Sequence, residues 1–128
     1  MILLLDTSTP TCRLSFVDEN WQYDATWEAA RSLAKGLLGF LEQELSDQKK
    51  SWNDITGIVV YRGPGSFTGL RIGVTVCNSL AYANALPIVG ATGDDWRIVG
   101  VRRLLQGEND RIILPEYGGD ANITQPRK

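Results

Sequence analysis

The densest group of chemically capable residues in this sequence is a run of glycines and hydroxyls. The run reads Gly63-Pro64-Gly65-Ser66-Phe67-Thr68-Gly69-Leu70-Arg71-Ile72-Gly73 and follows an apolar segment typical of a buried strand. Backbone N–H groups at a helix N-terminus can hold an anion, and Ser66 and Thr68 would add two hydroxyls. The run lacks the Gly-Lys-Ser/Thr ending of a P-loop and does not match the dinucleotide-binding fingerprint. A tight turn with Ser66 as the helix cap needs the same glycines, and we favour that interpretation.

The second candidate group is Asp6 and Thr7, which follow the first apolar run of the chain. In doubly wound and actin-like sheets, ligands lie at the carboxyl ends of the strands. A phosphate or metal site at the end of this first strand, beside the glycine run, is therefore the alternative to a purely structural turn. A two-metal nuclease needs further carboxylates at matching positions, whereas the neighbouring predicted strand ends in Arg62. The residues of the alternative anion or phosphate loop are Asp6, Thr7, Gly65, Ser66 and Thr68.

The composition excludes several classes of chemistry. The 128 residues contain no histidine, which removes Ser-His-Asp and Cys-His triads and histidine-ligated zinc. The length suits one domain, and a net charge of −2 gives no electrostatic footprint for wrapping nucleic acid. Cys12 and Cys77 lie in apolar runs, which indicates buried free thiols in a reducing compartment. The N-terminus does not read as a signal peptide, and we expect a cytoplasmic protein without a membrane span.

The elements that must position these groups follow from hydrophobic periodicity. An antiparallel meander over residues 2–5, 11–17 and 21–27 is followed by a helix over 28–45 and a strand over 55–61. The glycine run opens a helix over 67–85. A strand over 87–91, a helix over 95–105, a final strand over 111–114 and a polar tail from 118 complete the chain. This order predicts a single α/β half-domain of the actin-like, ribonuclease-H-like class, with helices packed on a mixed sheet.

The two longer predicted helices carry more apolar residues than one sheet face can hide. In the second of them, the stripes Leu70-Val74-Cys77-Ala81 and Ile72-Val76-Leu80-Ala83 leave only a narrow polar line. A helix in so small a domain should keep a broad polar face, so a second buried contact is expected. The alternative is that the helix over 95–105 covers this surface, which we favour less because that helix is short and rich in arginine.

Taken together, these features resemble the TsaB (YeaZ) family of bacterial proteins. The segments that carry the resemblance are residues 2–9, Cys12, the long glycine run from Arg62 to Gly73, and Pro87-Ile88-Val89-Gly90. The long glycine run is highly specific, and the resemblance covers residues 1–93. It implies an actin-like (ASKHA) domain that has lost ordinary nucleotide hydrolysis.

The resemblance also implies a role as a non-catalytic subunit. Family members pair with the catalytic subunit TsaD, and with TsaE the complex transfers a threonylcarbamoyl group to an adenosine beside the tRNA anticodon. We therefore expect no cofactor of its own, ATP used through TsaD-like and TsaE-like partners, tRNA contacted only through the complex, and no membrane contact. The expected partner interface consists of Leu33, Leu37, Phe40, Gly69, Arg71, Gly73, Val76, Asn78, Leu80 and Ala83.

Two features depart from the family pattern. Family members carry a second domain, whereas residues 94–128 are expected to form only a short helix, a strand and a polar tail in its place, with Pro115-Glu116-Tyr117 resembling a Pro-x-Tyr segment. The histidine at the start of the family's first helix is absent. Two alternative functions stay open: an ATP- or phosphate-binding enzyme of the actin-like class, and a homodimeric scaffold.

Overall fold

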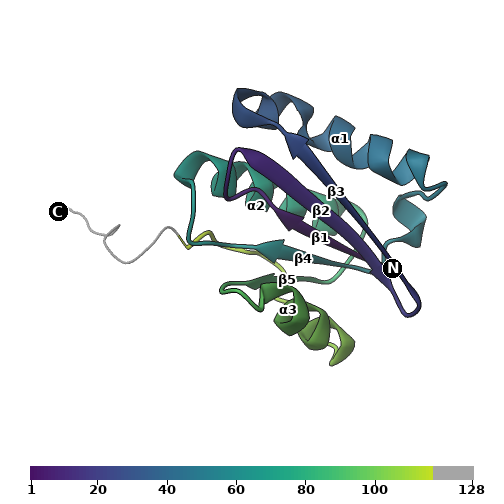
Figure 1. Ribbon diagram of the computed structural model, residues 1–128. Helices are drawn as coiled ribbons and strands as arrows, with labels where there is room; N and C mark the ends of the chain where they lie inside the picture. The colour runs from purple at the N-terminus through teal and green to yellow at the C-terminus, as the bar shows by residue number, and fades with distance from the viewer. Residues whose placement is uncertain (117–128) are drawn as a thin grey trace.

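A mixed sheet with strand order β3-β2-β1-β4-β5 forms the centre of the computed structural model (Figure 1), which describes residues 1–116. The strands pair antiparallel from β3 to β1 and parallel from β1 to β5. This arrangement confirms the predicted actin-like half-domain. Tyr117 and the polar tail lie outside the described residues. The strands are β1 Ile2–Asp6, β2 Thr11–Asp18, β3 Trp21–Glu28, β4 Gly57–Tyr61 and β5 Ile88–Ala91.

Three α-helices cover the two faces of this sheet. They are α1 Leu33–Asp47, α2 Phe67–Ala83 and α3 Trp96–Leu105, with short 3₁₀ turns at Ala30–Ser32 and Trp52–Asp54. The first helix begins later than expected because Ala30 has a positive φ of 44°. The N–H groups of Ala29 and Ala30 both donate to the Pro10 carbonyl, which holds the chain in a turn before α1 begins.

The side-chain alternation of β1 explains why the sheet has two cores. Leu3 and Leu5 face α1 and α2, while Ile2 and Leu4 face the side on which α3 lies. The helix α3 packs on β4 and β5, and α1 and α2 contact each other on the opposite face (Figure 1). The alternative that the last helix covers α1 and α2 is therefore wrong. Within residues 1–116, no helix combines the length and apolar character that crossing a membrane requires.

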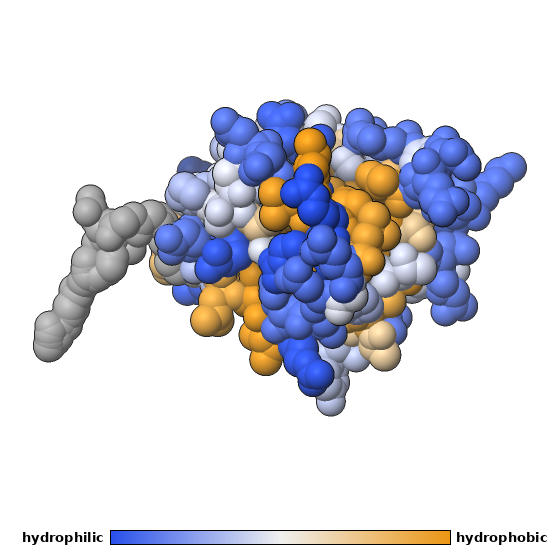
Figure 2. Space-filling view, turned by 90° about the horizontal axis from the view of Figure 1, so that it is seen from below, coloured by the Kyte–Doolittle hydropathy of each residue, from blue (hydrophilic) through white to orange (hydrophobic). Residues whose placement is uncertain are grey.

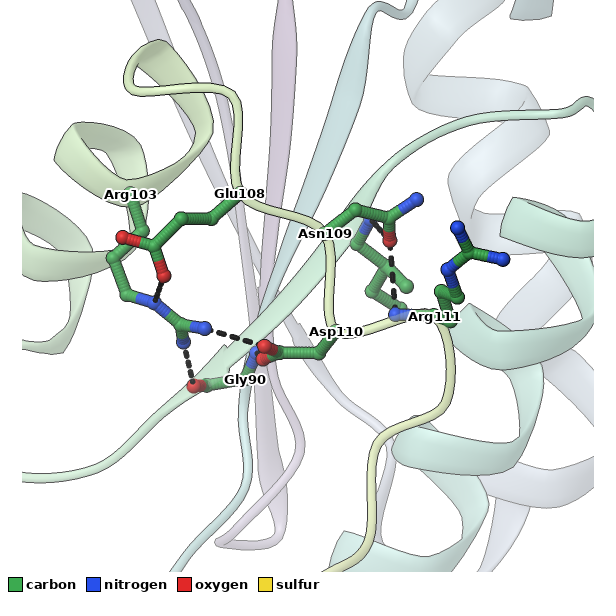
Figure 3. Close-up of polar contacts among 7 residues, drawn as sticks. Gly90, Arg103, Glu108, Asn109, Asp110 and Arg111 are labelled. Carbon is green, nitrogen blue, oxygen red and sulfur yellow. Dashed lines mark hydrogen bonds and ion pairs between the residues drawn. The ribbon is translucent and has the colours of Figure 1, made fainter.

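The final strand predicted over residues 111–114 does not form. Residues 109–114, which we call the edge strap, run beside β5 and satisfy its outer edge chiefly with side chains (Figure 3). The N–H groups of Ile88 and Gly90 donate to the carboxamide of Asn109 and the carboxylate of Asp110, at 3.1 and 3.0 Å. Only the Asp110 N–H to Ile88 carbonyl bond, at 2.8 Å, joins the two backbones. Side chains thus take the place of a strand ladder.

An arginine from α3 fixes the edge strap in position. Arg103 donates to the Gly90 carbonyl at 3.0 Å, and it forms ion pairs with Glu108 and Asp110 (Figure 3). Partial burial works to raise the pKa of Asp110. The hydrogen bonds from Arg103 and from the Gly90 N–H outweigh this effect, so the pKa of Asp110 lies below its ordinary value.

Candidate functional site

The end of β1 lies directly against the first two turns of α2. Thr7 is 1% exposed, and its hydroxyl donates to the Gly69 carbonyl at 2.7 Å. A Cβ atom at Gly69 would lie 2.2 Å from the Thr7 carbonyl oxygen, and one at Gly73 would lie 2.1 Å from the Thr7 hydroxyl oxygen. No real side chain tolerates such distances. The two helical glycines are therefore explained by the close approach of β1.

The turn before α2 uses its polar groups inside the protein. The Ser66 N–H donates to the Ser8 carbonyl at 2.9 Å, and the Ser66 hydroxyl accepts from the Gly69 N–H at 3.3 Å. Ser66 is thus the helix N-cap, as the tight-turn interpretation predicts. Gly65 packs against Ser8, where a Cβ atom would lie 2.5 Å from the serine Cβ. These groups of the expected anion loop stabilise the β1–α2 junction.

The remaining groups of the alternative anion loop are Asp6 and Thr68, and Thr68 lines the same surface groove as Ser66. Asp6 accepts from the Ser8 N–H at 2.8 Å, which makes it part of a local turn. Thr68 is exposed on the first turn of α2. Within residues 1–116, no three carboxylates or thiols lie close enough together to hold a metal ion.

Both thiols lie in the core between the sheet and α2, and Cys12 and Cys77 are each 0% exposed. Burial raises the pKa of each thiol to about 12, with smaller contributions from Asp6 at Cys12 and from Cys12 at Cys77. Both groups are therefore protonated thiols at neutral pH and are not nucleophiles.

Five of the ten expected interface residues make close contacts within the chain. Leu33 and Leu37 are 6% and 0% exposed in the core beneath α1, which leaves them little side-chain surface for a partner. Gly69 and Gly73 are covered by β1. The carboxamide of Asn78 binds the backbone of Ile113 in the edge strap, as donor at 3.0 Å and acceptor at 2.9 Å.

The other five expected residues lie closer to the surface. Phe40 packs on Trp27 at the β3 side of α1, with ring centroids 5.3 Å apart. Arg71 is exposed, and its guanidinium lies 5.4 Å from the Phe67 ring centroid. Val76 and Leu80 are half-buried and Ala83 is exposed along the outer side of α2.

Leu38 of α1, which is not among the expected interface residues, lies on the surface. Leu38 is 46% exposed, whereas its neighbour Leu37 is buried, and the sequence does not show which of the two leucines faces the sheet. A groove of about 480 Å³ runs between the beginnings of α1 and α2 and is lined partly by Ala34 and Ile72. We call the small and apolar residues along these two helices the paired-helix surface. It consists of Ala34, Leu38, Ile72, Val76, Leu80 and Ala83.

Comparison with known proteins gives a consistent result. Residues 27–95 match the family model for TsaD, tRNA N6-adenosine threonylcarbamoyltransferase. The chain is 30% identical over 131 residues to the tRNA threonylcarbamoyladenosine biosynthesis protein TsaB of Escherichia coli K12, covering 94% of this chain and 56% of that protein. It is 37% identical over 96 residues to a tRNA N6-adenosine threonylcarbamoyltransferase of Syntrophus aciditrophicus, covering 74% and 28%.

A solved structure resembles the chain as well. A crystal structure from Pseudomonas aeruginosa, described as an uncharacterized protein with similarity to peptidase YEAZ, superimposes with a TM-score of 0.67 at 31% identity. The match covers 71% of this chain and 42% of that one. The chain thus spans about half the length of the relatives it matches.

Proposed function

The chain belongs to the TsaB (YeaZ) family, and from this premise we propose that it is a non-catalytic subunit that pairs with a TsaD-like transferase. In this role it supports formation of threonylcarbamoyladenosine next to the tRNA anticodon. The observation that carries the proposal is the paired-helix surface. Within residues 1–116 the only other α-helix packs on the opposite face of the sheet, so this surface stays open.

The chemistry of the surface suits a partner built from the same elements. Small residues such as Ala34 and Ala83 allow helices to approach closely, and the half-buried Val76 and Leu80 offer apolar area to bury. The matched family model covers α1, β4, α2 and β5, so a TsaD-like protein carries a similar helix pair. Two such pairs can meet about a pseudo-twofold axis, as in an isologous dimer.

The proposal assigns the chemistry of transfer to the partner. The buried thiols are protonated, the Thr7 hydroxyl is buried in the β1–α2 junction, and the Ser66 hydroxyl caps α2. ATP would be used through the TsaD-like and TsaE-like partners, and tRNA would be bound by the complex.

Co-expression with a TsaD-like protein tests the proposal. We expect a one-to-one complex in size-exclusion chromatography with light scattering, and we expect the double substitution Leu38→Glu with Val76→Glu to abolish it. Ile98→Glu is the matched control, because Ile98 is 64% exposed on the α3 side of the sheet. Leu37 is unsuitable for this test because its substitution would unfold the core.

Two outcomes would reject the proposal. One is a complex that survives the double substitution in a variant whose circular dichroism and unfolding curve match the parent chain. The other is a chain that forms only a homodimer through α1 and α2 and ignores the transferase, which would favour the homodimeric scaffold. Threonylcarbamoyladenosine formation by the reconstituted complex, with and without the chain, reports the functional consequence.

A further inference from the structure

A second apolar surface lies on the opposite side of the sheet from the paired helices. A groove of about 500 Å³ separates α3 from the face of β1 and β2. Figure 2 views this side, and it shows hydrophobic residues on both sides of a hydrophilic ridge. The lining of the groove includes Leu4 and Val17 from the sheet and Arg97, Ile98, Arg102 and Leu105 from α3. We call it the α3 groove.

The helix α3 carries two apolar stripes and buries only one of them. Trp96 and Gly100 face the sheet, where a Cβ atom at Gly100 would lie 2.2 Å from Val59. The second stripe follows helical spacing through Ile98 and Leu105, which are 64% and 77% exposed. An amphipathic helix usually packs such a stripe against another element, and no element of residues 1–116 covers this one.

The sheet beside this stripe lacks a covering helix. On the other face, α1 and α2 cover the strands together, whereas on this face α3, the only α-helix that residues 1–116 place there, packs chiefly on β4 and β5. Val17 is half-buried at the groove, and the buried Leu4 and Ser15 form its floor. Layered α/β domains cover both sheet faces with helices. The uncovered part of the sheet next to α3, above β1 and β2, is therefore where a further helix would pack.

The charged side chains around the α3 groove indicate the charge of a partner that could bind there. Arg97 and Arg102 line it from α3, and neither has an ion-pair partner within residues 1–116. Asp24 on β3 senses the charge of Arg97, but its carboxylate accepts hydrogen bonds from Ser15 and Gln22. Two guanidinium groups beside an apolar floor favour carboxylates at the edge of whatever binds there.

We propose that the α3 groove binds an acidic amphipathic helix of a partner protein. Ile98 and Leu105 are seven positions apart, about 10 Å along α3, so two turns of a facing helix cover the stripe. Its apolar residues at i, i+3 or i+4, and i+7 pack on α3 and Val17, and its flanking carboxylates pair with Arg97 and Arg102. This surface is separate from the paired-helix surface.

Two other occupants fit the chemistry less well. Residues 117–128 are mostly polar and include Arg127 and Lys128, which the groove arginines would repel. A second copy of the chain would bring a second pair of arginines against Arg97 and Arg102. Both charge arguments favour an acidic helix from another protein.

Fluorescence anisotropy with defined peptides tests this proposal on the full chain. The probe is a labelled, side-chain-crosslinked helix of about 15 residues, with leucines at i, i+4 and i+7 and glutamates on both flanks. The matched probe has lysine in place of every glutamate. We expect saturable binding of the acidic probe and at least tenfold weaker binding of the basic one.

Substitutions locate the probe and test the charge argument. Arg102→Glu should weaken the acidic probe about tenfold and should strengthen the basic probe. Leu105→Gln should weaken both, whereas Leu38→Gln, an exposed leucine on α1, should change neither.

Three results would overturn the proposal. They are equal binding of the acidic and basic probes, loss of acidic-probe binding on Leu38→Gln with Leu105→Gln unaffected, and a concentration-dependent homodimer in sedimentation that Leu105→Gln dissociates. Binding of a TsaD-like protein is measured separately, so either proposal can fail alone.

Discussion

Replacing Gly73 by alanine tests the structural role of the glycine-rich turn. The added Cβ would lie 2.1 Å from the Thr7 hydroxyl oxygen and 3.0 Å from the Thr7 Cβ and Cγ2 atoms. Overpacking of this kind costs about 1–3 kcal/mol, and the gain in helix propensity of about 1 kcal/mol offsets only part of it. We expect Gly73→Ala to lower the free energy of unfolding by about 1 kcal/mol, and by no more than about 2 kcal/mol. Urea titration followed by the fluorescence of the four tryptophans measures it.

A double-mutant cycle makes the test specific. Thr7→Ala alone loses the hydrogen bond to the Gly69 carbonyl and should cost about 1–2 kcal/mol. It also removes the hydroxyl oxygen and Cγ2 atoms of Thr7, so that only its Cβ, at 3.0 Å, still crowds the new methyl group. The double variant should therefore be no less stable than Gly73→Ala alone, which gives a coupling energy of about 1–2 kcal/mol.

A matched control separates the clash from any general effect of glycine replacement. A Cβ atom at Gly39 of α1 would meet nothing within 4 Å, so Gly39→Ala should stabilise the chain by about 0.5–1 kcal/mol. Additive costs for Thr7→Ala and Gly73→Ala would refute the close-approach explanation. So would a Gly73→Ala variant as stable as Gly39→Ala.

Three further predictions concern the edge strap, the thiols and nucleotide binding. Asp110→Asn should lower stability by about 1–2 kcal/mol in neutral solution, because it weakens the bonds to Gly90 and Arg103. Since the folded pKa of Asp110 is depressed, the deficit should shrink as the pH falls below about 4, the ordinary aspartate value, and chemical unfolding across this range checks the sign. Cys12 and Cys77 should resist iodoacetamide at pH 8 until the chain unfolds, as mass spectrometry would show. Calorimetric titration of the chain alone with ATP should give no saturable heat, and tight binding would favour the enzyme alternative.

The antiparallel meander and the N-cap could be predicted because local signals and the tertiary structure agree there. The meander alternates with a period of two, and Ser66 precedes a helical stripe, so the residues themselves define β2 and the beginning of α2. The glycines before and within the start of α2 likewise predicted the tight turn.

The choice of partner-facing residues could not be predicted in the same way. In α1, the stripes of Leu37 and Leu38 are equally apolar, and only the position of the sheet decides that Leu37 is buried. The apolar residues 112–114 read as a strand, but the side chains of Asn109 and Asp110 satisfy the β5 edge instead. Both errors arise where long-range packing overrides local pattern.

Hydrogen–deuterium exchange of the chain, alone and bound to a TsaD-like transferase, tests the central claim most directly. If the paired helices form the interface, complex formation will slow exchange in peptides from α1 and α2, while peptides from α3 keep their rates. Slowed exchange confined to α3 and β5, or unchanged exchange in both helices of a demonstrated complex, would contradict the account.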